Sequence, residues 1–219
     1  MTKNLTTKLA IAMCAGGLIG AATIAAGPVE NAVVAAGVMG VGDVKVGDQA
    51  PDFSLVDTAG TTHKLSDYTK QGKIVVLEWF NPGCPFVVKN HETFTTMTDT
   101  YAEFKDKDVV WLAVNSGAAG KQGNGKEINA KMKSQWKIDY PILLDETGAT
   151  GKAFGAKTTP HMFVIGKDGA VAYRGAIDNA PTPNKQGDVN YVKDALNSLI
   201  AGETISKPDT KPYGCSVKY

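Results

Sequence analysis

The sequence predicts an α/β layer fold with a central, partly parallel sheet. Two continuous apolar runs, Ile74–Phe80 and Val109–Val114, are rich in β-branched residues, which is typical of strands buried on both faces. The segment between them instead carries apolar residues at helical spacing. Strands that alternate with helices in this way form layers in which helices cover the sheet.

The domain is expected to open with a β-hairpin. Pro51–Val56 alternates apolar and polar residues, which indicates a strand, and a turn around Gly60 leads into a second short strand at His63–Leu65. Ser66 can then begin a short helical turn. The hairpin is an N-terminal extension of the main sheet.

The remaining elements follow in alternation. A long helix after Cys84 is predicted from five apolar residues that share one face: Val87, Phe94, Met97, Tyr101 and Phe104. A last helix is expected to be capped by Asp188 and ended by Gly202. Between these two helices we expect a helix at Lys126–Trp136, a strand at Ile142–Leu144, a helix at Ala149–Phe154, and a hairpin of Met162–Ile165 with Ala170–Tyr173.

The first 36 residues have the layout of a secretory signal peptide. Basic residues at Lys3 and Lys8 precede an apolar run, Leu9–Ala26, that is rich in small residues. An uncleaved membrane anchor is the rival interpretation, since the run is close to the shortest length that spans a bilayer. Cys14 is expected to be an incidental residue of this segment rather than a lipidated one.

We therefore divide the chain into a signal peptide or anchor with linker, residues 1–36, and one domain, residues 46–219. The protein is expected to be exported to a periplasm or secreted, and to touch a membrane only if the N-terminal segment is retained.

Composition argues against several classes of function. The net charge is +1 and Arg174 is the only arginine, so nothing favours binding to nucleic acid. The three histidines lack metal-ligand spacing, and we expect no metal and no cofactor. Gly120 to Lys126 resembles a phosphate-binding loop, but the next residue is Glu127 rather than the Ser or Thr that would hold magnesium.

Cys84 is the strongest candidate for chemistry. It directly follows a predicted buried strand and a Pro-Gly turn, and Pro85 suits the first turn of a helix. Backbone N–H groups at such a position favour an anion, and a thiolate is the nucleophilic form of cysteine. The alternative is a small apolar residue that fills the junction. A second proline, Pro160, precedes a predicted strand and is a candidate for a cis peptide bond.

Several motifs together resemble the thioredoxin superfamily. They are Glu78–Pro85, Thr159–Ile165, Asp168-Gly169 and Tyr173-Arg174-Gly175. The peroxiredoxin-like redoxin branch is the most similar, because its Gly-Cys-Ser-(Ile/Val)-Lys-aromatic tail matches residues 214–219. The resemblance covers about residues 46–219 and implies a thioredoxin-like fold, a central mixed sheet flanked by helices. It also implies a substrate groove near Cys84 that is formed by Pro85, Thr159, Pro160 and His161.

Two departures from the superfamily bear on function. Thioredoxins carry Cys-x-x-Cys, but Val87 stands where their second cysteine would be. Peroxiredoxins use Pro-x-x-x-Thr-x-x-Cys and a distant arginine, whereas Pro82 lies only two residues before Cys84 and the matching arginine position holds Pro160. The resemblance therefore favours disulfide exchange over the peroxidase apparatus.

Cys215 has three possible roles. It can be the resolving cysteine that attacks a mixed disulfide on Cys84, or form a permanent structural disulfide with Cys84, or remain an unpaired thiol. A structural disulfide would close a loop of more than a hundred residues, which would stabilise the folded state by about 4 to 5 kcal/mol in the chain-entropy model. Among neighbouring polar residues, His91 is expected to be a semi-buried structural histidine and Lys89 to lie on a solvated helix face.

Three functions remain open. The first is an exported thiol-disulfide oxidoreductase that uses Cys84 and Cys215 on protein or small-molecule disulfides and thiols, with a reducing partner that the sequence does not name. The second is a thiol peroxidase acting on peroxide. The third is a non-enzymatic binding or structural module with a permanent Cys84–Cys215 bridge.

Overall fold

A computed structural model describes residues 42–219, and the predictions for the N-terminal 36 residues lie outside that range. A seven-stranded mixed sheet forms its centre, with the strand order β2-β1-β5-β4-β3-β7-β8. Strands β3, β4 and β5 run parallel, whereas β1 pairs antiparallel with β5, and β7 with β3. The thioredoxin-like mixed sheet and the N-terminal hairpin of β1 with β2 are therefore confirmed.

The strands and helices have the following bounds: β1 (Ser54–Asp57), β2 (Thr62–Lys64), α1 (Leu65–Thr69), β3 (Ile74–Trp79), α2 (Pro85–Val88), the π-helical turn η1 (Lys89–Thr93), α3 (Thr96–Phe104), β4 (Val109–Asn115), α4 (Lys126–Gln135), β5 (Ile142–Leu144), α5 (Ala149–Phe154), β6 (Thr158–Thr159), β7 (Met162–Ile165), β8 (Val171–Gly175), α6 (Tyr191–Ala201) and β9 (Cys215–Ser216).

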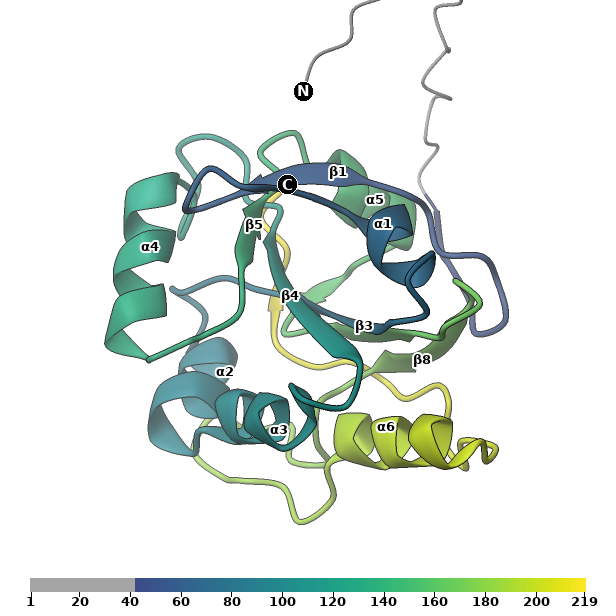
Figure 1. The fold of residues 1–219 in the computed structure, drawn as a ribbon. Coiled ribbons are helices and arrows are strands. Elements are labelled where there is room, and N and C mark those ends of the chain that lie inside the picture. The colour runs from purple at the N-terminus through teal and green to yellow at the C-terminus, as the bar shows by residue number, and fades with distance from the viewer. Residues whose placement is uncertain (1–41) are drawn as a thin grey trace, which may run out of the picture. The chain divides into compact units, whose positions relative to one another are not determined.

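Strand β3 divides the core into two layers because successive side chains of a strand point to opposite faces. Ile74 and Val76 join the cluster covered by α3 and α6, whereas Val75 and Leu77 join the cluster covered by α1 and α5. Figure 1 shows these two pairs of helices on opposite sides of the sheet. All six residues of β3 are buried, as the apolar run predicts for a central strand.

The helix predicted after Cys84 is broken into three pieces. Helix α2 has only four residues, η1 follows it, and α3 restarts after Thr95, whose φ of 54° is left-handed. The wider π turn buries Lys89, Asn90 and His91, three polar residues in succession. The apolar spacing correctly predicts the buried face of α3. It does not predict the break before α3, because a π turn shifts the phase of the helix.

The cap of the last helix differs from the prediction. The side chain of Asn190, not of Asp188, accepts a hydrogen bond from the backbone of Lys193 at 2.9 Å and caps α6. Asp188 lies two residues earlier and accepts a hydrogen bond from Asn179. Gly202 ends the helix with φ 71°, as predicted.

Candidate functional site

Cys84 lies where the chain leaves the sheet and enters α2. Strand β3 ends at Trp79, and the Asn81 side chain accepts a hydrogen bond from the Gly83 backbone at 2.8 Å, which folds the turn before Cys84. Cys84 is the N-terminal cap of α2, and Pro85 is its first residue and is exposed. The predicted order of strand, turn, cysteine and helix is present, although α2 is too short for a substantial helix dipole.

The second predicted motif meets Cys84 across the fold. The Thr159–Pro160 peptide bond is cis, as the sequence suggested. The neutral Cys84 thiol donates a hydrogen bond to the Thr159 carbonyl oxygen, with sulfur and oxygen 2.9 Å apart. Residues 75 positions apart in the sequence therefore form one site.

The C-terminal segment completes this site. Strand β9 pairs antiparallel with β6, so that Cys215 lies opposite Thr159 and Ser216 opposite Thr158. Cys215 packs against the same apolar cluster that contains Cys84. Both cysteines are free thiols, Cys84 buried and Cys215 partly buried. The structure thus brings together Cys84, Thr159, Pro160 and Cys215.

The two thiols differ in their acidity. Burial alone would raise the pKa of Cys84, but hydrogen bonding from the side chains of Cys215 and Thr159 and from the Cys215 and Val87 backbone amides lowers this pKa below that of an ordinary thiol. Burial, together with the interaction with Cys84, raises the pKa of Cys215 to about 11. Cys84 is therefore the sulfur that becomes a thiolate first, and Cys215 keeps its proton and donates it.

Access to this sulfur is closed in the structure. Cys84 is 0% exposed, and Thr159 and His161 are 1% and 4% exposed. The tail, which we define as residues 207–219, runs past them and is held at several backbone points, including Thr210 N to Arg174 O at 3.0 Å and Ala118 N to Lys218 O at 2.7 Å. We expect access of an external disulfide to Cys84 to require movement of the tail, because Cys215 packs against the same cluster as Cys84.

His161 is too deeply buried to act as a cation. Burial, with Arg174 and Lys157 nearby, lowers its pKa to about 3. Its Nδ1 accepts a hydrogen bond from the Lys157 backbone at 3.3 Å, and its ring packs on Phe163. At neutral pH, His161 thus has no charge with which to stabilise the Cys84 thiolate.

A buried polar network lies on β3, six residues before Cys84. The fully buried carboxylate of Glu78 contacts His91 Nε2 at 2.6 Å, Tyr140 OH at 3.0 Å and Trp111 Nε1 at 3.3 Å. His91 is therefore structural, as predicted, and more deeply buried than the sequence suggested. The role of Glu78 could not be anticipated, because its partners come from η1, from β4 and from the segment before β5.

The expectation for Lys89 is wrong. Lys89 is 0% exposed rather than solvated, and its Nζ lies 3.2 Å from Asp178 Oδ2, which is also buried. The two residues are 89 positions apart, so sequence spacing gives no sign of the pair. Arg174, in contrast, lies next to the last residue of β8 and pairs with Asp209 and Asp43.

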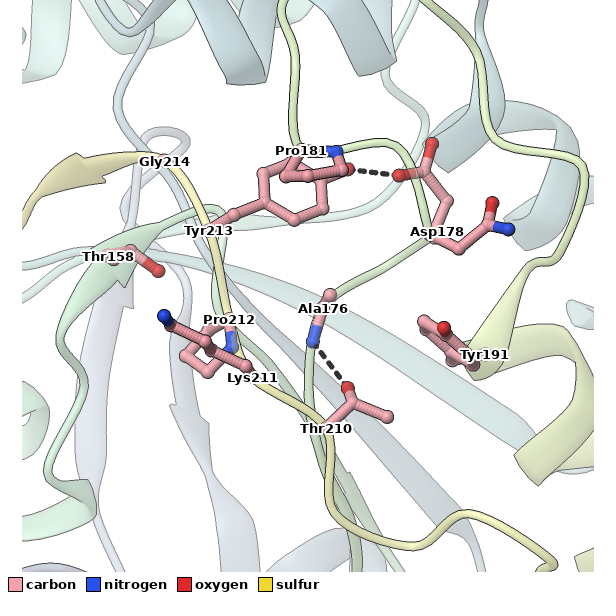
Figure 2. Close-up of a pocket in the computed structure, with 11 residues that line it drawn as sticks. Thr158, Ala176, Asp178, Pro181, Tyr191, Thr210, Lys211, Pro212, Tyr213 and Gly214 are labelled. Carbon is pink, nitrogen blue, oxygen red and sulfur yellow. Dashed lines mark hydrogen bonds between the residues drawn. The ribbon is translucent and has the colours of Figure 1, made fainter.

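A cavity of about 510 Å³ lies beside the tail (Figure 2). Tail residues form one wall, and the loop after β8 with Tyr191 forms the other. Thr158 and Gly214 place it one residue away from Thr159 and Cys215. Its lining residues are Thr158, Ala176, Asp178, Asn179, Pro181, Tyr191, Thr210, Lys211, Pro212, Tyr213 and Gly214.

Residues 42–219 contain neither a candidate metal site nor a helix that could cross a membrane. Within this range, no cluster of three or more His, Cys, Asp or Glu side chains is arranged to hold a metal ion. The helices in the same range are all too short or too polar to cross a bilayer.

Gly214 controls how closely the tail approaches the site. It has φ 136°, and a Cβ there would lie 2.1 Å from the Thr159 carbonyl oxygen, the atom that Cys84 contacts. We expect Gly214→Ala to push the tail away and to speed alkylation of Cys84 by iodoacetamide at least about ten-fold, because a clash with backbone cannot relax cheaply. Gly202→Ala is the control, since it also has positive φ but meets no atom within 4 Å. Equal rates in the two variants would contradict this account of the tail.

Comparisons with known proteins agree with this geometry. The Redoxin family model matches residues 45–196. Two relatives are thiol-disulfide oxidoreductases ResA: that of Geobacillus kaustophilus is 32% identical over 58% of this chain and 67% of its own. That of Bacillus subtilis is 31% identical over 80% of this chain and 86% of its own.

Solved structures extend the match in three dimensions. An uncharacterized conserved protein from Geobacillus kaustophilus superposes with a TM-score of 0.72 at 28% identity, covering 80% of this chain and 92% of that one. The family model spans well over half of the chain, and its match includes Cys84 and the Thr159–Pro160 turn. The chain therefore belongs to the Redoxin family, within the thioredoxin superfamily.

Proposed function

We propose that this protein is an exported thiol-disulfide oxidoreductase in which Cys84 attacks the substrate and Cys215 resolves the intermediate. The observation that carries the proposal is the placement of Cys215 against the Cys84 site by pairing of β9 with β6. The named activity of the ResA relatives, thiol-disulfide oxidoreductase, supports the same reaction class.

The reaction has two exchange steps. The Cys84 thiolate attacks one sulfur of a substrate disulfide, forms a mixed disulfide and releases the other sulfur as a thiolate, which takes up a proton. Cys215 then loses its proton and attacks Cys84 Sγ, so that a Cys84–Cys215 disulfide forms and the second substrate thiolate leaves and is protonated. The substrate gains two electrons and two protons, and the protein loses them. A dithiol reductant must restore the two thiols.

The pKa values suit these roles. A lowered pKa of Cys84 supplies thiolate for the first attack at neutral pH, whereas the raised pKa of Cys215 keeps that thiol protonated until the mixed disulfide forms. Thr159, Pro160 and His161 form the surface against which substrate would lie once the tail withdraws, with Pro85 exposed at its edge. Tail withdrawal is consistent with the shortness of the ladder between β6 and β9, two residues on each strand.

Trapping the intermediate tests this order of attack. Cys215→Ser, incubated with a disulfide peptide, is expected to accumulate a mixed disulfide at Cys84, visible by mass spectrometry, because no resolving thiol remains. The unmodified protein should instead yield the Cys84–Cys215 disulfide. An adduct found on Cys215 in the unmodified protein, with Cys84 unreacted, would reverse the roles and contradict the proposal.

Export is proposed from the N-terminal sequence pattern alone. Residues 1–36 fused to alkaline phosphatase, which is active only after export from a bacterial cytoplasm, should give phosphatase activity. Loss of that activity when Leu18 and Ile19 are both replaced by Asp would agree. An inactive parent fusion would contradict export.

A further inference from the structure

A buried charged cluster joins the Cys84 helix to the tail. Lys89 lies five residues after Cys84, and its Nζ contacts Asp178 Oδ2 at 3.2 Å, the Ala180 carbonyl at 2.7 Å and Tyr213 OH at 3.2 Å. Lys89 and Asp178 are 0% and 2% exposed. We call Lys89, Asp178 and Tyr213 the anchor cluster.

Tyr213 is the tail's contribution to the cluster. Its hydroxyl donates a hydrogen bond to Asp178 Oδ1, drawn as a dashed line in Figure 2. Its ring packs against Phe86 with centroids 5.7 Å apart, and Lys89 Nζ lies 5.1 Å from the ring centroid. Three segments thus meet at one hydroxyl: the turn after Cys84, the loop after β8, and the tail two residues before Cys215.

The chemistry of this hydroxyl makes the contact persistent. Burial and the neighbouring Asp178 carboxylate raise the pKa of Tyr213, so the phenol stays protonated and can donate over the physiological pH range. A hydrogen bond to a charged group contributes more than one between neutral groups, and the low local dielectric strengthens it further. Asp178 loses one of its donors whenever the tail lifts.

The place of the Tyr213–Asp178 hydrogen bond in the fold indicates its role. The ladder of β6 with β9 ties Cys215 to Thr159, whereas the anchor cluster ties the tail directly to the segment that carries Cys84. Only Gly214 separates Tyr213 from Cys215. The Tyr213 hydroxyl is therefore well placed to set the distance between the two sulfurs.

We infer that the anchor cluster positions the tail for catalysis, with Tyr213 as the positioning residue that holds Cys215 against Cys84 and closes the site. This inference rests on the proposed function for its catalytic consequence. It requires no new chemistry, since Tyr213 touches neither sulfur in the proposed steps. Its consequence is that the same contact favours resolution of a mixed disulfide and restricts entry of substrate.

Tyr213→Phe tests the inference because it removes the hydroxyl and keeps the ring. Tyr191→Phe is the matched control, because Tyr191 lines the same cavity but does not belong to the anchor cluster. The first readout is the fraction of Cys84–Cys215 disulfide at equilibrium in glutathione buffers, which reports the effective concentration of Cys215. The second is the rate of Cys84 alkylation by iodoacetamide in a Cys215→Ser background, which reports tail opening without any redox step.

Tyr213→Phe is expected to lower the effective concentration of Cys215 about ten-fold or more and to raise the alkylation rate by a similar factor, with Tyr191→Phe unchanged in both. Values for Tyr213→Phe equal to those of the parent, or equal shifts in the two variants, would overturn the inference and leave the proposed function intact. If the parent forms no intramolecular disulfide but Tyr213→Phe still speeds alkylation of Cys84, the positioning of the tail is upheld and the proposed function fails. Thermal unfolding of both variants confirms that the comparison is between folded proteins.

Discussion

Replacing Cys84 with serine is expected to reduce disulfide reductase activity to background, a loss of at least about 1,000-fold. A serine hydroxyl does not ionise near neutral pH and cannot form a mixed disulfide, so both exchange steps are lost. The measurement is reduction of a fluorogenic glutathione disulfide or of insulin, with dithiothreitol as the dithiol reductant. The side chain is nearly the same size, so the buried site should keep its packing.

The matched variant is Cys215→Ser, which without added thiol should release one substrate thiol per protein and then stop at the Cys84 mixed disulfide. It keeps the attacking thiolate and removes only the thiol that releases the substrate. Activity that survives Cys84→Ser would show that another group carries the reaction. Rapid oxidation of Cys84 by hydrogen peroxide, far above the rate for a small free thiol, would instead favour the peroxidase alternative.

Replacing Lys89 with methionine is expected to lower the free energy of unfolding by about 3 to 5 kcal/mol. Methionine keeps the length of the side chain but leaves the buried Asp178 carboxylate without its cation, and an uncompensated buried charge is costly. Urea unfolding, followed by tryptophan fluorescence, measures the change.

Lys193→Met provides the control, since Lys193 pairs with Glu103 at 2.6 Å and both side chains are over a third exposed. Exposed pairs contribute little because water screens them, so this variant should change stability by less than about 1 kcal/mol. Similar losses in the two variants would mean that burial of the Lys89–Asp178 pair does not have the energetic role assigned to it.

The sequence predicts the central elements because their signals are local. Strand β3 is a continuous apolar run, and helix α5 begins and ends at the predicted residues, Ala149 and Phe154. Strands β6 and β9 have two residues each and exist only through their mutual pairing, so no periodicity can reveal them. The break in the helix after Cys84 is likewise invisible in apolar spacing, because the η1 turn is stabilised by distant partners of Lys89 and His91.

The candidate site could be predicted only in part, for the same reason. Cys84 and Pro160 were found because each stands next to a strand boundary and a turn, where local sequence is informative. The sequence leaves three roles open for Cys215, and none of them predicts that it lies opposite Thr159. The sequence gives a wrong environment for Lys89 and no role for Glu78, because charged residues are normally solvated. Only the tertiary structure supplies their buried partners, Asp178 for Lys89 and Tyr140 for Glu78.

The pH dependence of alkylation at each cysteine tests the central claim most directly. Wild-type reduced protein is treated with iodoacetamide across pH 4 to 11, and mass spectrometry assigns the product to Cys84 or Cys215. Since only thiolates react, the rate at Cys84 should rise with a midpoint below that of an ordinary thiol, and the rate at Cys215 with a midpoint near 11. A midpoint for Cys84 at or above that of Cys215 would contradict the account, because the buried sulfur would then not be the thiolate of the pair.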